Sequence, residues 1–440
     1  MKSYVPNTAA ERVEMLKTIG LNSMDELFGD IPNELKLNRP LELPAPMSEM
    51  EIRNLIAGYV LQNEDGGLLF RGAGVYHHYI PALIPQLVSR SEFYTAYTPY
   101  QAEMSQGMLQ SIFEWQSVIC NITGMEASNA SVYDGATAAA ESLIMLANIR
   151  RKHRVLYSAA LNPGVIATMK TYAHCQGIEL VEIPVNAAGI TDMDMLRGAL
   201  PDSAGYIAAQ PNYFGCIENM DEIAEIVHEH KALLVSYVNP ISLGVIKRPA
   251  DYGADIAIGD TQPMGIPMNF GGPYAGFMAT TNKLIRNLPG RIAGETTDAE
   301  GGRVFVLTLQ AREQHIRRDK ASSNICSNEM LAAIMSTMYA CTMGPQGMKE
   351  IGEQNIAKAH YLANELCKLP GMHLRYNTPF FNEFVIDSEC PAEQINDGLK
   401  EYGIVGGLVL PDGGMLWCAT EMNSKEDIDF VIEMLKEVIR

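Results

Sequence analysis

GDTQPMGIPMNFGGP, residues 259–273, is the stretch on which the fold prediction rests. It follows the apolar residues 254–258, which predict a buried strand, and it ends in paired glycines before the chain becomes apolar again. Glycines in such a loop let the backbone pass close to another group. The stretch therefore predicts a site at the end of a strand, with Gln262 within it and no lysine.

Short apolar runs alternate with helix-length segments in the part of the chain that leads to this stretch. Helical patterns such as residues 219–230 separate the runs. Strands separated by helices predict βαβ units and a mainly parallel sheet, so the predicted fold class is α/β. The predicted strands are residues 154–160, 177–185, 205–211, 232–238 and 254–260.

The two ends of the chain differ from this middle part. Residues 8–20 and 47–63 predict helices, each with Thr or Ser at a capping position and Glu three residues later. Two helical segments over residues 328–369 are followed by shorter strands that alternate with helices. We expect a helical arm over residues 1–65, a large α/β domain over residues 66–325 and a small α+β domain over residues 326–440.

The composition is that of a globular chain with an acidic surface. Of 440 residues, 47% are hydrophobic and 19% are charged, and the formal net charge is -19. An acidic surface repels a phosphate backbone, so neither nucleic acid nor an anionic membrane is expected as a partner. The eight cysteines lack zinc-site spacing and predict mostly buried thiols in a reducing cytoplasm, with no metal. No signal peptide or membrane span is recognised, so we expect a cytoplasmic protein.

The segment SVYDGATAAAES places small residues at the start of a strongly helical run. Backbone N–H groups of Gly135, Ala136 and Thr137 would be free to bind an anion, and the helix dipole favours negative charge there. One interpretation is a phosphate cup. The other is that Asp134 caps the helix and the alanines pack closely on a neighbour.

A loop of this form after a strand is typical of pyridoxal phosphate enzymes, in which a lysine holds the cofactor. The candidate position here is Gln262. Such enzymes also need a carboxylate beside the pyridine nitrogen, and the strand expected to supply it has Tyr237 and Asn239 instead. Lys247 and Lys283 are interpreted as surface groups. Both absences indicate that the chain is poorly equipped for this chemistry alone.

Two further segments are candidate sites. In RSEFYTAYTPYQAEMSQG, Tyr97, Tyr100 and Gln101 belong to a dense set of hydroxyl and amide groups that predicts an interface or a ligand site, or half-buried packing residues. In REQHIRRDK, basic residues gather in an otherwise acidic chain and predict either a site for anionic groups or a solvated helix face. The basic candidates are Arg312, Arg317 and Arg318.

These segments occur together in a recognisable order: GAGVYHHYIP, EFYTAYTPYQAEMSQG, ICNITGMEASNASVYDGATAAAES, GADIAIGDTQPMGIPMNFGGPYAGF and REQHIRRDKASSNIC. The set closely resembles the N-terminal half of the glycine decarboxylase family, the P-proteins of the glycine cleavage system, over nearly the whole chain. The resemblance implies the fold of pyridoxal-phosphate-dependent transferases (fold type I, aspartate aminotransferase-like). This fold has a mostly parallel seven-stranded sheet and a small C-terminal α+β domain.

The resemblance also implies a function. A chain of this length corresponds to subunit 1 of a two-subunit glycine dehydrogenase (decarboxylating). Subunit 2 would hold pyridoxal phosphate covalently, and the two would form a heterotetramer of two plus two subunits. Together they would decarboxylate glycine and pass the aminomethyl group to the lipoyl arm of the H-protein. This would be an oxidoreductase acting on CH-NH2 with a disulfide acceptor, and this chain would not be active alone.

For the site, the resemblance implies that Gln262 replaces the cofactor lysine and that Gly135, Ala136 and Thr137 form a vestigial phosphate loop. Tyr97, Tyr100 and Gln101 would complete the active site across the subunit interface, with the basic cluster as a second candidate. An alternative is a catalytically silent scaffold that stabilises subunit 2 and docks the H-protein. A pyridoxal enzyme acting by itself through an unconventional lysine is a third hypothesis, against which the missing lysine and acid both argue.

Overall fold

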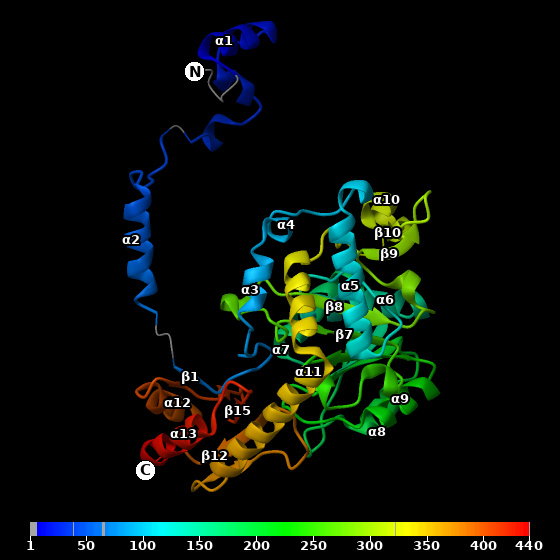
Figure 1. Cartoon of the computed structure of the whole chain (residues 1–440), viewed down its shortest axis with the longest axis vertical. Coiled ribbons are helices and arrows are strands. Elements are labelled where there is room, and N and C mark those ends of the chain that lie inside the picture. The colour runs from blue at the N-terminus through cyan, green and yellow to red at the C-terminus, as the bar shows by residue number, and fades with distance from the viewer. Residues whose placement is uncertain (1–6, 38, 64–66, 322, 440) are drawn as a thin grey trace. The chain divides into compact units, whose positions relative to one another are not determined.

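The computed structural model describes residues 7–37, 39–63, 67–321 and 323–439. The chain divides into two compact units, residues 1–65 and 66–440 (Figure 1). The predicted boundary between residues 65 and 66 falls at residues outside the described ranges. That boundary and the one between residues 325 and 326 remain predictions.

The first unit holds two helices, α1 (Ala9–Thr18) and α2 (Glu49–Val60), with the 3₁₀ turns Met24–Phe28 and Asn33–Leu35 between them. Thr8 caps α1 and Ser48 caps α2, each in a reciprocal capping box with a glutamate three residues later, as predicted. α2 has no buried residue among those described, and α1 buries only Leu16. The helices are therefore stabilised by their caps and not by a core of their own.

The second unit is built on a seven-stranded sheet, which confirms the predicted fold class. The strand order is β2-β8-β7-β6-β5-β3-β4. Neighbouring strands from β7 to β4 run parallel, whereas β8 is antiparallel to both β7 and β2. The strands are β2 (Ala127–Ser128), β3 (Arg154–Ser158), β4 (Glu179–Ile183), β5 (Gly205–Gln210), β6 (Leu233–Val238), β7 (Ile256–Asp260) and β8 (Gly276–Thr280).

Alternate residues of these strands enter two different hydrophobic cores, because successive side chains of a strand point to opposite faces. In β5, Tyr206 and Ala208 pack with α5, α8, α9 and α11, whereas Ile207 and Ala209 pack with α6 and α7. Both faces are covered, which explains why the central strands β5 and β6 are largely apolar, whereas the edge strand β4 carries Glu179 and Glu182. The helices are α5 (Gln106–Thr123), α6 (Gly135–Arg150), α7 (Pro163–Gln176), α8 (Met193–Ala199), α9 (Met220–Glu229) and α11 (Met330–Leu366).

α11 consists of two helical segments, as the sequence predicts. It is kinked at Gly344, whose φ of 61° and ψ of 179° are not helical, directly before Pro345. The part of α11 before the kink lies beside α5, and the part after it leads to the C-terminal sheet (Figure 1). Outside the sheet, short helices α3 (Leu83–Val88), α4 (Ser91–Tyr94) and α10 (Gln314–Arg317) and the hairpin of β9 (Ile292–Thr297) and β10 (Arg303–Thr308) are added.

The C-terminal region forms a second, four-stranded sheet of order β11-β12-β15-β14. It packs with α12 (Ala392–Lys400), α13 (Lys425–Val438) and the end of α11. A pairing between β1 (Leu68–Leu69) and β13 (Ile404–Val405) brings residues from the start of this unit into that core, where Phe70 is fully buried. The other strands are β11 (Met372–Leu374), β12 (Glu383–Ser388), β14 (Leu408–Val409) and β15 (Met415–Cys418).

The cysteines differ from the expectation of mostly buried thiols. All eight are free, but only Cys216 and Cys418 are buried, while four are exposed. The prediction was wrong because cysteines on α7 and α11 lie on outward-facing positions of their helices. Within the described ranges, no helix combines the length and apolar character that crossing a membrane requires.

Candidate functional site

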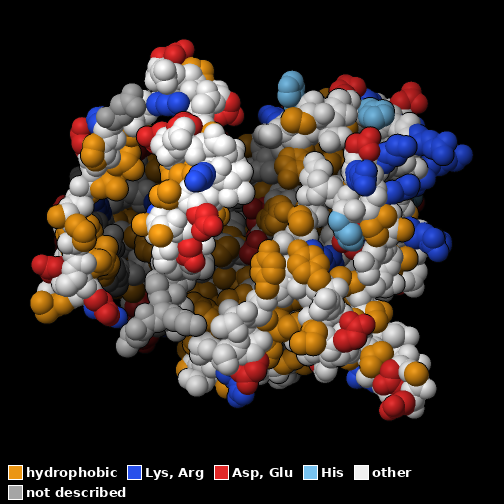
Figure 2. Space-filling model, turned by 90° about the horizontal axis from the view of Figure 1, so that it is seen from above, with side chains coloured by type: hydrophobic (Ala, Val, Ile, Leu, Met, Phe, Trp, Pro, Cys, Tyr) orange, Lys and Arg blue, Asp and Glu red, His pale blue; other side chains and the backbone are white. Residues whose placement is uncertain are grey.

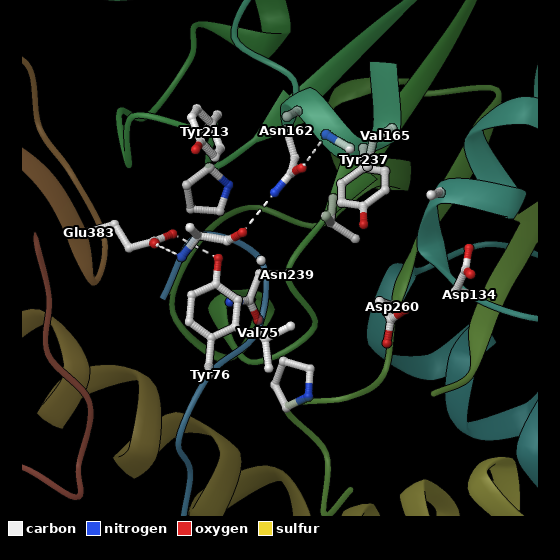
Figure 3. Close-up of a pocket in the computed structure, with 18 of the residues that line it drawn as sticks. Val75, Tyr76, Asp134, Asn162, Val165, Tyr213, Tyr237, Asn239, Asp260 and Glu383 are labelled. Carbon is white, nitrogen blue, oxygen red and sulfur yellow. Dashed lines mark hydrogen bonds between the residues drawn. The ribbon is translucent and has the colours of Figure 1, made fainter. Parts of the chain in front are cut away.

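A cavity of about 430 Å³ opens at the carboxyl ends of β5, β6 and β7, beside the first turn of α6 (Figure 3). This edge of an open α/β sheet is where such folds bind ligands. The C-terminal region contributes Glu383, and the segment after β1 contributes its backbone and Tyr76. The lining residues that carry polar side chains are Tyr76, Asp134, Asn162, Asn212, Tyr213, Tyr237, Asn239, Asp260, Tyr274 and Glu383.

Gln262 lies just after β7, as predicted, but its side chain is bonded to the backbone and does not line this cavity. Its Nε2 donates to the carbonyls of Tyr76 (2.9 Å) and Ile266 (3.0 Å), and its Oε1 accepts from the Tyr76 N–H (2.9 Å). The side chain is 2% exposed. Gln262 is therefore a structural cross-link between the loop after β7 and the segment that carries Tyr76.

Two backbone N–H groups in the first turn of α6 donate to carboxylates of this chain. The Gly135 N–H donates to Asp260 (2.9 Å) and the Thr137 N–H donates to Asp134 (2.6 Å). Ala136 lines the cavity between them. A Cβ on Gly135 would lie 2.3 Å from the Tyr237 hydroxyl oxygen, so the close packing there requires glycine. The geometry corresponds to the capped-helix interpretation of this segment.

Three carboxylates, Asp134, Asp260 and Glu383, face the cavity (Figure 3). Burial, with a smaller contribution from the nearby Asp134, raises the pKa of Asp260 to about 7, although the N–H groups of Gly135 and Gln262 donate to it. Burial also raises the pKa of Glu383 to about 7, although the Ala73 N–H (2.6 Å) and the Tyr76 hydroxyl (2.7 Å) donate to it. Among the lining residues, all of which are described, there is no lysine, arginine or histidine. The cavity is therefore acidic.

These residues do not fit pyridoxal phosphate. The phosphate would meet Asp134 and Asp260 where the fold offers free amides, and no lining amine could bond to the aldehyde. β6 ends in Asn239, whose Oδ1 accepts from the Ile241 N–H (3.0 Å), and it supplies no negative charge for a pyridine nitrogen. Lys247 and Lys283 are both exposed, and Lys247 is paired with Asp221. No step of a pyridoxal reaction can be assigned to this cavity.

The tyrosine tract lies away from the cavity, in the segment between α4 and α5. Tyr97 is 76% exposed and Tyr100 is 63% exposed, and Gln101 is exposed as well. The two tyrosine rings lie 6.4 Å apart, and the guanidinium of Arg291 lies 5.4 Å from the centre of the Tyr100 ring. Pro99 between them is buried and anchors the segment. Large aromatic side chains exposed together are typical of an interface.

The three arginines of the basic cluster fall into two groups. Arg312 donates to the carbonyls of Leu288 and Gly290 and so braces the loop before β9. Arg317 and Arg318 are exposed at α10. Figure 2 shows blue side chains gathered at the right of the molecule, on the side where Figure 1 places α10. Arg317 and Arg318 therefore remain candidates for binding an anion, whereas Arg312 has a structural role.

Sequence reasoning missed three groups of this site. Asp260 ends a strand that the sequence predicts, and its position beside Gly135 could have been inferred because helices of βαβ units begin at the sheet edge where parallel strands end. Glu383 lies 307 residues from its partner Tyr76, so no local pattern could have found it. Arg291 lies 191 positions after Tyr100, in a segment without an evident motif.

Comparisons with known proteins identify the family. Residues 2–435 match the family model of the glycine cleavage system P-protein. Among similar proteins are the probable glycine dehydrogenase (decarboxylating) subunits 1 of Moorella thermoacetica and Bacillus cereus (strain B4264). The first is 46% identical and covers 99% of this chain and 100% of the relative, and the second is 45% identical and covers 98% of each.

Solved structures agree with this. A crystal structure of glycine decarboxylase (P-protein) of the glycine cleavage system, in inhibitor-bound form, superposes with a TM-score of 0.90 at 40% identity, over 99% of this chain and 100% of that one. A NifS-like protein shares the fold alone, with a TM-score of 0.63 at 12% identity over 85% of this chain and 99% of that one. Sequence motifs, sheet topology and these matches all give the same answer: the chain belongs to the glycine cleavage system P-protein family.

Proposed function

We propose that this chain is subunit 1 of a two-subunit glycine dehydrogenase (decarboxylating). With subunit 2 it would decarboxylate glycine and transfer the aminomethyl group to the lipoyl arm of the H-protein, in a heterotetramer of two plus two subunits. The relatives named as probable subunits 1 are matched over 98% and 100% of their own length, which supports the same role here.

The observation that carries the proposal is the chemistry of the cavity at the sheet edge. It has three carboxylates and no amine among its lining residues, and the N–H groups of Gly135 and Thr137 at the start of α6 already donate to two of these carboxylates. A chain of this family that cannot hold pyridoxal phosphate in its own cavity needs a second chain that does. Pyridoxal phosphate is therefore assigned to a lysine of subunit 2, and this chain is inactive alone.

In this proposal the tyrosine tract is the contribution of the chain to the shared active site. Tyr97, Tyr100 and Gln101 are exposed on one segment, so their hydroxyl and amide groups can reach a group held by another chain. Their role is to position the substrate and exclude water, not to transfer a proton. The exposed Arg317 and Arg318 would bind an anionic group of substrate or of the H-protein.

The test uses the complex of this chain with subunit 2. We expect Tyr97→Phe and Tyr100→Phe each to lower the rate of glycine–bicarbonate exchange at least about tenfold, which corresponds to losing ~1.4 kcal/mol of stabilisation at the reacting centre. Gln101→Ala should act in the same direction. Assembly, followed by sedimentation, should be unchanged. Borohydride reduction of the complex should leave the pyridoxyl label on subunit 2.

A catalytically silent scaffold predicts a different result. In that case the same substitutions would weaken assembly, and the complex that still forms would retain its full exchange rate. A stoichiometric label on a lysine of this chain would contradict both hypotheses. The matched control is Tyr402→Phe, because Tyr402 is also exposed but lies in the C-terminal region.

A further inference from the structure

Arg291 is a buried arginine at the edge of the tyrosine tract. It lies between the loop that Arg312 braces and strand β9, and it is 6% exposed. Its backbone carbonyl accepts from the Ala130 N–H (2.8 Å), and Ala293, two residues later, is held by the side chain of Gln116 through two hydrogen bonds. The backbone around Arg291 is therefore fixed on both sides.

The guanidinium of Arg291 has no partner of opposite charge within the described ranges. Its Nη1 is buried without a hydrogen bond, and no carboxylate oxygen lies within 4.0 Å of the group. Arg375, in contrast, has two carboxylate partners: oxygens of Asp387 and Asp412 each lie 2.6 Å from its guanidinium. The chain has 52 acidic and 33 basic residues, so acidic residues outnumber the basic residues that could pair with them. A buried charge without a partner is unfavourable, so Arg291 needs a partner from elsewhere.

The contact that Arg291 does make points toward the tyrosine tract. Its guanidinium lies over the ring of Tyr100, at 5.4 Å from the ring centre, and Tyr100 is itself 63% exposed. A cation over an aromatic face holds the ring in place and leaves the N–H edges of the guanidinium for another ligand. Arg291 thus contacts Tyr100, one of the residues that the proposed function assigns to the subunit interface.

We propose that Arg291 binds a carboxylate at this interface. The planar fork of N–H groups suits a carboxylate, which it can hold with two parallel hydrogen bonds. The carboxylate comes from glycine or from an acidic side chain of subunit 2, two sources of the same chemistry. This inference rests on the proposed function, since it needs the tyrosine tract to meet the second subunit. Arg291 also holds the Tyr100 ring in the orientation that this contact requires.

The experiment compares Arg291→Gln and Arg291→Lys with Arg286→Gln, an exposed arginine in the same loop region, all in complex with subunit 2. If the carboxylate belongs to glycine, Arg291→Gln raises the glycine KM at least tenfold and affects kcat less. The glycine KM of Arg291→Lys should then lie between those of the wild type and Arg291→Gln. If the source is an acidic side chain, the dissociation constant of the two subunits rises at least tenfold, while the glycine KM of the assembled complex stays the same. Arg286→Gln should change neither.

Other results would overturn the inference. If Arg291→Gln leaves both the glycine KM and the subunit affinity unchanged, no carboxylate binds there. If the complex loses pyridoxal phosphate with an unchanged glycine KM, the guanidinium serves the cofactor phosphate instead. If the isolated Arg291→Gln chain melts at a clearly lower temperature than the wild type, the group has a structural role. Failure of the proposed function is distinct, because wild-type subunit 1 would then add nothing to the exchange activity of subunit 2.

Discussion

Replacing Glu383 by glutamine tests whether the acidic cavity lowers the stability of the chain at neutral pH. Glu383 is 4% exposed in β12, and it accepts hydrogen bonds from the Ala73 N–H and the Tyr76 hydroxyl. Burial raises its pKa from the ordinary 4.5 to about 7. The carboxyl group is therefore held more easily in its neutral form, and a glutamine of nearly the same shape is neutral at every pH.

The sign and size of the effect on the free energy of unfolding follow from the difference in the pKa of Glu383 between the folded and unfolded states. Because the folded pKa is higher than the unfolded one, the stability contributed by the proton is present below about pH 4.5 and is lost as the pH rises through about 7. The difference between 4.5 and about 7, at 1.36 kcal/mol per pH unit, gives about 3 kcal/mol. Reversing the hydrogen bond with Tyr76 costs about 1 kcal/mol. Glu383→Gln should then be about 2 kcal/mol more stable than the wild type at high pH.

Urea unfolding followed by tryptophan fluorescence measures this directly. Trp115 and Trp417 are both fully buried, and Trp417 in β15 pairs with Phe384, the neighbour of Glu383. Between about pH 5.5 and about pH 8.5, the stability of Glu383→Gln relative to the wild type should increase by about 2 kcal/mol. The control is Glu389→Gln, which removes an exposed acid just after β12. A Glu383→Gln stability difference that stays constant between these two pH values would refute the reasoning.

Two further substitutions test the packing around the start of α6 and the loop after β7. Gly135→Ala places a methyl group 2.3 Å from the Tyr237 hydroxyl oxygen, so it should lower the free energy of unfolding by about 1–3 kcal/mol. Adding Tyr237→Phe to the same chain should recover part of that loss. Equal losses in the single and the double variant would contradict this contact. Gln262→Lys removes three hydrogen bonds of a side chain that is 2% exposed, so it should destabilise the chain without creating a cofactor site. The measurement is borohydride reduction in the presence of pyridoxal phosphate. A stoichiometric pyridoxyl label on the introduced lysine would show that the acidic cavity accepts the cofactor phosphate.

The elements of the large sheet could be predicted because their signals are local. Residues 205–211 and 232–238 are apolar runs separated by an amphipathic helix, and they form β5, α9 and β6 within two residues of the prediction. The caps of α1 and α2 were equally predictable, since a capping box needs only four residues in sequence. The two helical segments of α11 were predictable for the same reason, because Gly344 and Pro345 interrupt the helical pattern and the backbone is not helical at Gly344.

The sequence alone determined the family and the α/β class, because the motifs and apolar runs that indicate them are residues close together in the chain. It also predicted that Gln262 and Asn239 stand where pyridoxal chemistry needs a lysine and an acid. Only the tertiary structure decided which side chains meet around the cavity. Glu383 reaches the cavity from 307 residues beyond Tyr76, Asp260 accepts from the N–H of Gly135, and Arg291 lies against Tyr100 with no carboxylate partner among the residues that the structure describes. These juxtapositions depend on how the sheet, the C-terminal region and the β9 hairpin pack together. Burial then raises the pKa of a carboxyl group or separates a guanidinium from solvent. Because burial depends on tertiary packing, a local sequence pattern cannot predict it.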